Sequence, residues 1–355
     1  MADADLEPDV AGPEIPRGQP AAAPAGRKLA LLVLAIAATL AGLYVLLPAI
    51  AGLDNTWNRL TKGDPWWLSV ALGLELLSFA SYVVFFRAVF AVGSREIDWR
   101  VSYRITMAGV AATRLLATAG AGGVILTVWA LEKRGMQGRE VALRMSTFLV
   151  VLYAVFMAAL VIVGLGLRSG VLPGAAPFGL TVIPALFGAM VIAGAILIRV
   201  LAHDLDHALA RLMAADGRAA RWGRALATVP AAVASGLTEA LRLVKSRRPG
   251  LLGAIGWWAF DVAVLWACLE AFGDGPTIWV VIMAYFVGML ANVLPVPGGL
   301  GAVDGGMIGA LIGFGVSGGL AIVAVLSYRA FAFWLPTVPG AIAYAQLLRE
   351  SHADR

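Results

Sequence analysis

Long runs without a charged side chain constrain this protein more than any other feature of its sequence. No residue is charged in 29–53, 145–167, 169–198, 275–303 or 305–328. About 20 apolar residues are enough to cross the hydrocarbon core of a bilayer. The chain is 60% hydrophobic and only 14% charged, whereas a soluble domain has about 25% charged residues. The sequence therefore predicts an all-α polytopic membrane protein.

Eight hydrophobic segments lie between two polar tails, and a basic stretch separates five of them from the last three. This stretch has leucines at helical spacing, which predicts amphipathic helices at the cytoplasmic face. Binding of anionic headgroups and a plain basic loop both fit its charge. The segments run roughly over 29–50, 66–92, 103–131, 145–167, 178–200, 250–272, 276–315 and 319–347. The predicted divisions are a disordered cytoplasmic tail (1–28), a transmembrane domain (29–348, with first half 29–200, amphipathic linker 201–249 and second half 250–348) and a cytoplasmic tail (349–355).

The stretch NVLPVPGGLGAVDGG, residues 292–306, lies in the middle of 275–328, where Asp304 is the one charged residue. It holds two prolines, five glycines and one carboxylate. Proline ends a helix and glycine permits a tight reversal. We therefore expect one half-helix to end near Leu294 and a returning half-helix to begin near Gly299. Backbone groups freed by such a break must be buried in protein or line a wet cavity.

A related motif occurs 179 residues earlier in the chain. GVAATRL at 109–115 and GMLANVL at 288–294 share their first, fourth and seventh residues. The glycines that follow are also spaced alike, since Gly120 and Gly122 correspond to Gly299 and Gly301. Chance similarity between two segments rich in glycine and alanine is the alternative. Placement favours a repeat, because each copy follows a span that carries an acid, Glu75 or Asp261.

The charges of the loops assign opposite orientations to the two interrupted segments. Lys and Arg flank the first on both sides, within 95–104 and 133–144, whereas the flanks of the second have none. Basic loops are cytoplasmic by the positive-inside rule, so the first segment is expected to enter and leave on the cytoplasmic side. The predicted fold has about six full spans plus two re-entrant broken-helix hairpins, as inverted-topology repeats with both termini cytoplasmic.

Ionisable residues inside the apolar segments are candidates for function. Each costs about 2.5–3.5 kcal/mol at the bilayer centre on the insertion scale. Arg114 precedes the first break and Arg329 lies in the last segment, and either guanidinium could hold a phosphate through two hydrogen bonds. Asp304 could carry a proton or pair with Arg329; the alternative is that it only complements its own helix dipole. The residues proposed for proton or ion coupling are Glu75, Asp261 and Asp304.

Several motifs resemble those of a known family. LPVPGGLGAVDGGMIGALIGFGV, followed by SYRAF, P-x-x-P-G and Tyr344, resembles the C-terminal signature of the lysylphosphatidylglycerol synthase transmembrane family, also called flippase-like or UPF0104. AATRLLATAGAGG resembles its first-half motif, and the likeness covers about residues 30–348. The family commonly has Glu in place of Asp304 and Pro in place of Leu116. With the repeat, the resemblance implies these substrate-binding candidates: Arg114, Gly120, Gly122, Pro295, Pro297, Gly298, Gly299, Gly301, Asp304 and Arg329.

The resemblance implies a lipid-translocating region without the soluble synthase domain that larger members attach. The leading prediction is a lipid flippase or lipid-translocating transporter that moves an anionic or phosphate-bearing headgroup across a bacterial inner membrane. An aminoacyl-phospholipid and a polyprenyl-phosphate-linked sugar are both candidate cargoes. The alternative is an accessory membrane subunit that presents lipid to a separate synthase or glycosyltransferase. We expect no enzymatic activity, metal, cofactor or nucleic-acid partner, and a homo-oligomer is compatible with the sequence.

Overall fold

The computed structural model describes residues 62–91, 97–115, 121–201, 218–293, 299 and 301–353. The described chain is helical and contains no strand. Within these described residues, five helices are long and apolar enough to cross a membrane: Pro65–Phe90, Gly138–Arg168, Phe178–Val200, Pro249–Phe272 and Gly318–Glu350. The predicted all-α polytopic fold class is confirmed. The expected first span, 29–50, lies outside the described residues.

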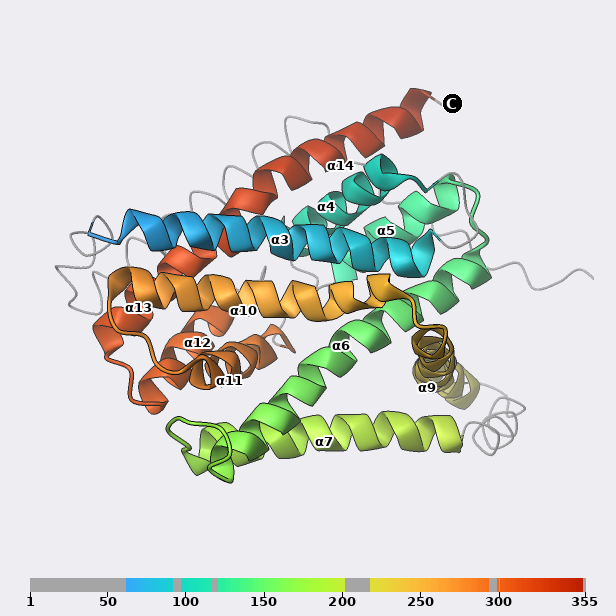
Figure 1. The fold of residues 1–355 in the computed structure, drawn as a ribbon. Coiled ribbons are helices and arrows are strands. Elements are labelled where there is room, and N and C mark those ends of the chain that lie inside the picture. The colour runs from blue at the N-terminus through green and yellow to red at the C-terminus, as the bar shows by residue number, and fades with distance from the viewer. Residues whose placement is uncertain are drawn as a thin grey trace, which may run out of the picture. The chain divides into compact units, whose positions relative to one another are not determined.

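The helices follow the chain in two groups separated by an amphipathic helix (Figure 1). The first group comprises α3 (Pro65–Phe90), α4 (Trp99–Leu115), α5 (Ala121–Lys133), α6 (Gly138–Arg168) and α7 (Phe178–Val200). The helix between the groups is α9 (Arg218–Lys245), within the expected linker. The second group comprises η1 (Pro249–Leu251), α10 (Leu252–Phe272), α11 (Ile278–Met289), η2 (Leu290–Val293), α12 (Ala302–Gly313), α13 (Gly318–Arg329), η4 (Ala330–Trp334) and α14 (Leu335–Ala353).

Helix α9 lies across the long helices, since it is viewed end-on beside the end of α7 in Figure 1. It packs on α6 and α7. Gly236 permits the contact with α6, because a Cβ there would lie 2.9 Å from the Ser146 carbonyl carbon. Small residues at such a crossing let two helix backbones approach closely. The sequence 202–217, which precedes α9 in the expected linker, lies outside the described residues.

The two acid-bearing helices, α3 and α10, lie side by side and form the largest helix pair (Figure 1). Gly253 brings their backbones together, because a Cβ at this position would lie 2.4 Å from the Ser81 carbonyl oxygen. Ser78 Oγ donates a hydrogen bond to the Trp257 carbonyl across the same contact, at 3.0 Å. Helix α4 packs on α3 and helix α11 packs on α10, so the pair contacts one helix of each interrupted segment.

Each interrupted segment consists of two helices that pack on each other. Gly123 of α5 lies against α4, since a Cβ there would be 2.5 Å from the Gly109 carbonyl oxygen. Gly288 of α11 lies against α12, since a Cβ there would be 2.8 Å from the Met307 nitrogen. In Figure 1 the α4–α5 pair lies toward the end of α3 and the α11–α12 pair toward its start.

The boundaries of the second break differ from the expected ones. Helix α11 ends at Met289, five residues before Leu294, and continues only as a 3₁₀ turn. The returning helix, α12, begins at Ala302 rather than near Gly299. Gly299 and Gly301 have φ angles of 66° and 77°, which lie outside the right-handed helical region. Gly299 and Gly301 therefore form part of the turn, and α12 begins only after them.

The elements of the two halves repeat at the spacing of the sequence motifs. Adding 179 to the bounds of α4 gives 278–294, and α11 with η2 covers 278–293. The same shift takes α5 to 300–312, where α12 covers 302–313. It takes α6 to 317–347, where α13, η4 and α14 cover 318–353. Helix order and spacing thus agree between the halves.

Candidate functional site

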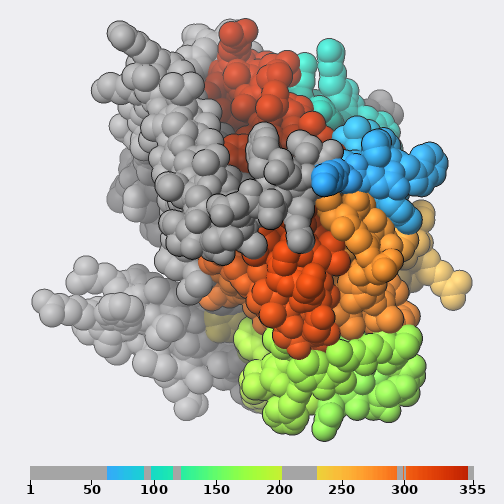
Figure 2. All heavy atoms as spheres, turned by 90° about the vertical axis from the view of Figure 1, so that its left-hand side faces the viewer, coloured from blue at the N-terminus to red at the C-terminus, as the bar shows by residue number. Residues whose placement is uncertain are grey.

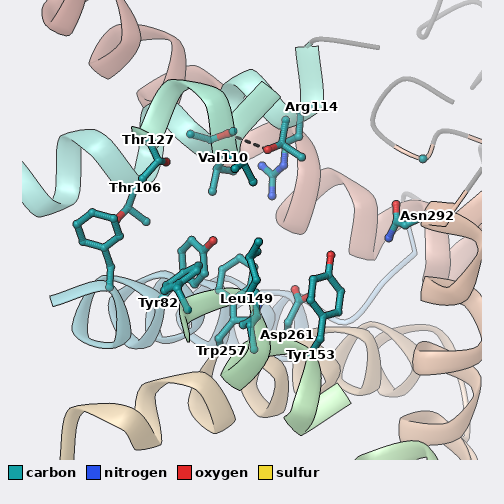
Figure 3. A pocket seen from close by; sticks show the side chains of 18 of the residues that line it. Tyr82, Thr106, Val110, Arg114, Thr127, Leu149, Tyr153, Trp257, Asp261 and Asn292 are labelled. Carbon is teal, nitrogen blue, oxygen red and sulfur yellow. Dashed lines mark hydrogen bonds between the residues drawn. The ribbon is translucent and has the colours of Figure 1, made fainter. Parts of the chain in front are cut away.

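A cavity of about 490 Å³ is lined by residues of both interrupted segments (Figure 3). Arg114 and Ala121, on either side of the first break, both line it. Asn292 and Gly299, from the second break, line it as well. Its volume is within the range of about 300–1,000 Å³ that is usual for small-molecule sites. The structure thus brings residues of both breaks to one site.

The two walls of the cavity differ in chemistry. The α4–α5 wall carries polar groups, among them Thr106, Thr113, Arg114 and Thr127. The opposite wall, from α3, α6 and α10, is largely aromatic, and Figure 3 shows three of its labelled rings facing Arg114 across the space. The aromatic residues of that wall are Tyr82, Phe86, Phe90, Phe148, Tyr153 and Trp257. The cavity can therefore hold a molecule with both polar and apolar parts.

Arg114 joins the first break to the last helical stretch of the chain. It lies in the last turn of α4. Its Nη1 donates to the Phe333 carbonyl at 2.9 Å and its Nη2 to the Ala332 carbonyl at 2.5 Å. Both carbonyls belong to η4, a π-helical turn between α13 and α14, and such turns frequently occur at functional sites. Arg114 is thus placed both to hold this turn and to face the cavity.

Arg329 and Asp304 form a buried ion pair. Their side chains are 8% and 10% exposed, and Arg329 Nε donates to Asp304 Oδ1. The other carboxylate oxygen accepts from the Gly301 N–H at 2.9 Å, which caps the first turn of α12. Asp304 therefore pairs with Arg329 and also stabilises the start of its own helix. Arg329 lines the cavity and lies at the end of α13.

Two further buried carboxyl groups, those of Asp261 and Glu75, belong to the helices α10 and α3. Asp261 of α10 lines the cavity, and its Oδ2 accepts hydrogen bonds from Tyr285 and, at 3.0 Å, from Tyr328. Glu75 of α3 is 2% exposed, interacts electrostatically with Asp261 and does not line the cavity. Within the described part of the chain, Glu75 Oε2 has no hydrogen-bond partner. One carboxyl thus lines the cavity and interacts with a second carboxyl that is buried in the protein.

The other sequence candidates are distributed around this site. Gly122 is buried in the first turn of α5. Gly299 lines the cavity, and a Cβ there would lie 2.5 Å from Asn292 Oδ1. Gly301 immediately precedes α12. Gly120, Pro295, Pro297 and Gly298 lie outside the described residues.

The aromatic wall, the two tyrosines that bond Asp261, and the cavity-lining Thr106 and Asn292 were not among the residues expected from the sequence. Tyr285 and Tyr328 are polar side chains within apolar segments. A buried Tyr hydroxyl usually finds a hydrogen-bond partner, which is the signal that could have linked them to an acid. Within the described residues no group of three or more His, Cys, Asp and Glu side chains could hold a metal ion.

These features define a polytopic α-helical membrane protein in which two broken-helix pairs adjoin one cavity. The chain belongs to the family described as the lysylphosphatidylglycerol synthase TM region, whose family model matches residues 29–340. The predicted family is thus confirmed.

Two relatives from Methanothermobacter thermautotrophicus, each named UPF0104 membrane protein, are similar to parts of the chain. One is 33% identical over 104 residues, which are 28% of this chain and 30% of the relative. The other is 34% identical over 86 residues, which are 24% of this chain and 26% of the relative. The matched regions therefore span less than a third of either relative.

Proposed function

We propose that this protein is a lipid-translocating transporter of the flippase type in a bacterial inner membrane. A phosphate-bearing headgroup crosses through the cavity while its hydrocarbon chains stay in the lipid. The observation that carries the proposal is that helix breaks from both halves line one cavity within a bundle of apolar helices. Paired interruptions of this kind are the best sequence pointer to a transport site in membrane proteins.

An inverted-topology repeat supports this function. The two halves share element order at a spacing of 179 residues, and their broken pairs lie toward opposite ends of α3. The hydrogen bond from Ser78 to Trp257 joins two residues that are themselves 179 positions apart. A two-fold axis that relates the halves would pass between these two residues. The two broken pairs are then re-entrant hairpins that enter the membrane from opposite sides.

The headgroup is anionic because the cavity offers it guanidinium groups. Arg114 and Arg329 both line the cavity, and guanidinium matches phosphate geometry through paired N–H donors. The family takes its name from a lysylphosphatidylglycerol synthase, so an aminoacyl-phospholipid is one candidate cargo; a polyprenyl-phosphate-linked sugar is the other. Glu75 and Asp261 carry the coupling proton, since two like charges side by side in a low-dielectric site repel each other.

Transport in proteoliposomes tests the proposal directly. Fluorescent phospholipid in the inner leaflet becomes open to an impermeant quencher only after it crosses, and wild type should speed this crossing. Arg114→Gln removes the charge and should reduce transport at least about tenfold, if one charged hydrogen bond of about 1.5–3 kcal/mol is lost. Arg87→Gln is the matched control. Arg87 also donates to a backbone carbonyl, that of Ile97 at 2.9 Å, but does not line the cavity.

Native mass spectrometry of the same variants identifies the cargo. A defined phosphate-bearing lipid that is retained by wild type and by Arg87→Gln, and lost by folded Arg114→Gln, would support the site. Equal transport by wild type and Arg114→Gln would contradict it. A chain that moves no lipid but purifies with a lipid-modifying enzyme would instead be an accessory subunit.

A further inference from the structure

One end of the cavity is polar but uncharged. Thr106 of α4 and Thr127 of α5 line this end, which we call the threonine end. Figure 3 shows both threonines away from Arg114 and Asp261. Among the described residues that line the cavity, the charged ones are these two and Arg329, which is paired with Asp304. The threonine end therefore suits hydroxyl groups of a ligand better than an ionic group.

The hydroxyl of Thr106 is not used by the fold. Thr106 is 3% exposed, and within the described chain its Oγ1 has no hydrogen-bond partner. Two other buried threonines, Thr147 and Thr181, each donate to a carbonyl four residues earlier, at 2.8 Å. A buried hydroxyl without a partner is unfavourable. Because Thr106 lines the cavity, a bound molecule can supply that partner.

The hydroxyl of Thr127 provides a second polar group at the threonine end. Thr127 is 9% exposed and belongs to α5, the helix that packs on α4. Gly109 of α4 leaves room beside this hydroxyl, because a Cβ there would lie 3.1 Å from Thr127 Oγ1. A Ser or Thr hydroxyl both donates and accepts hydrogen bonds. Two such groups on neighbouring helices match a ligand that carries several hydroxyls.

The opposite wall offers a flat aromatic surface. Tyr82 and Trp257 both line the cavity, with ring centroids 4.3 Å apart and an interplanar angle of 32°. The face of an aromatic ring is negative, so it attracts the C–H groups of a sugar ring, which carry partial positive charge. Recognition of an ammonium group by an aromatic cage needs several ring faces around the cation. These two rings instead pack on each other and present one surface.

The distance along α4 requires a headgroup that continues beyond its phosphate. Thr106 and Arg114 lie eight residues apart on this helix, which is about 12 Å along its axis. A headgroup whose phosphate binds Arg114 reaches Thr106 only if a further group is attached to that phosphate. This further group meets hydroxyls on one wall and aromatic rings on the other. A sugar ring has both kinds of surface, since its hydroxyls lie at the edge and its C–H groups on the faces.

We propose that the threonine end, with Tyr82 and Trp257 opposite, is a sugar-binding subsite. The phosphate of the lipid lies at Arg114. A sugar or polyol ring joined to that phosphate lies on the aromatic surface and exchanges hydrogen bonds with the hydroxyls of Thr106 and Thr127. A polyprenyl-phosphate-linked sugar and a phospholipid with an inositol ring share this chemistry. The inference rests on the proposed transport function and names the headgroup class that it carries.

Lipid pairs that differ only in the ring test the subsite. Native mass spectrometry of the whole protein compares polyprenyl-phosphate glucose with polyprenyl phosphate, and phosphatidylinositol with phosphatidic acid. Wild type should retain the ring-bearing lipid of one pair at least about tenfold more than its partner, since two hydrogen bonds together give about this factor. The pair that shows the preference identifies the source of the ring. Equal retention within both pairs would overturn the subsite, as would stronger retention of an aminoacyl-phosphatidylglycerol than of either ring-bearing lipid.

A hydroxyl deletion tests Thr106 itself. Thr106→Val should reduce the preference for the ring about two- to tenfold, the value of one hydrogen bond, and leave retention of the bare phosphate lipid unchanged. Thr181→Val is the matched control for a buried threonine. Thr181 lies near the start of α7, at the α6–α7 turn on the face shown in Figure 2, and does not line the cavity. Equal preference in Thr106→Val and Thr181→Val would overturn the role of Thr106.

Thermal unfolding of the lipid-free variants separates binding from a structural role. Thr106→Val removes an unpaired buried hydroxyl, so its unfolding temperature should be at least that of wild type. Thr181→Val removes a hydroxyl that is bonded, so its unfolding temperature should not rise. A lower unfolding temperature for Thr106→Val than for Thr181→Val would mean that the fold uses this hydroxyl, and would overturn the subsite.

The quenching assay distinguishes failure of the subsite from failure of the transport function. Fluorescent forms of the same four lipids are reconstituted with wild type and Thr106→Val. Faster crossing of the ring-bearing lipid in wild type, with the advantage reduced in Thr106→Val, would support the subsite. Equal crossing of ring-bearing and bare lipids would overturn the subsite and leave the transport function standing. Crossing of none of the four lipids would overturn both.

Discussion

The two interrupted segments share a backbone plan but not a chemistry. Equivalent glycines, Gly109 and Gly288, face the returning helix of each segment. The charges are not repeated: the position equivalent to Arg114 is Val293, and those equivalent to Asp304 and Arg329 are Ile125 and Val150. In the second segment, Asp304 forms an ion pair with Arg329 of the next helix, α13. In the first segment, Arg114 instead donates to carbonyls of a π turn in the other half. The two segments therefore share their helix breaks and contact glycines, whereas their charged residues differ.

The largest expected effect comes from breaking the ion pair of the second segment. Removing one partner of a buried pair leaves an uncompensated charge and typically costs about 3–5 kcal/mol. Asp304→Ile and Arg329→Val, which install the first-half residues one at a time, should each lower the free energy of unfolding by this much. Thermal unfolding in mild detergent measures it.

The double variant Asp304→Ile/Arg329→Val is the control, because it leaves no unpaired charge. It should recover most of the lost stability, since a well-packed apolar replacement of a buried pair is often neutral. A double variant as unstable as the sum of the two single variants would mean that the pair does not act as a unit.

A smaller effect is expected from making the first break resemble the second. Arg114→Val installs the residue found at the equivalent position and removes the donors to Phe333 and Ala332. A hydrogen bond that involves a charged group contributes about 1.5–3 kcal/mol, and because both bonds come from one guanidinium we expect their combined loss to lower the free energy of unfolding by about this amount. Arg114→Lys keeps the charge but cannot donate to both carbonyls as a guanidinium does, so its stability should lie between those of wild type and Arg114→Val. Equal stability of all three proteins would exclude a role for Arg114 in holding the π turn.

The glycines at the equivalent hairpin contacts should differ in their tolerance of a methyl group. A Cβ at Gly288 would lie 2.8 Å from a backbone nitrogen, whereas one at Gly109 would lie 3.1 Å from the Thr127 hydroxyl. Overpacking costs about 1–3 kcal/mol, and backbone yields less readily than a side chain. Gly288→Ala should therefore lower the unfolding temperature more than Gly109→Ala does. The reverse order would show that the first hairpin is the more tightly packed.

The smallest effect is expected at the junction of the two halves. Ser78→Ala removes the hydrogen bond to the Trp257 carbonyl, which is worth about 0.5–1.5 kcal/mol. The loss should appear as a small decrease in thermal stability with little change in lipid transport. Ser69→Ala is the control, because Ser69 bonds only the Pro65 carbonyl of its own helix, at 2.8 Å. A large loss of transport in Ser78→Ala would instead place the moving part of the protein at this junction.

Much of the fold could be predicted because its signals are local. Hydrophobic length determines where a helix can span, and Gly and Pro determine where one must stop. Arg114 was expected just before the first break, and α4 indeed ends at Leu115. The end of α11 at Met289 was not expected, because proline was expected to stop the helix only near Leu294 and the 3₁₀ turn has no clear sequence signal.

By itself, then, the sequence determined the apolar spans, the two interruptions and their spacing, because these depend on the residues of each segment alone. Tertiary structure decided which groups meet. Arg114 binds a carbonyl 219 positions away, and Asp261 binds hydroxyls 24 and 67 positions away. Such partners come from separate helices, and only packing sets their distance.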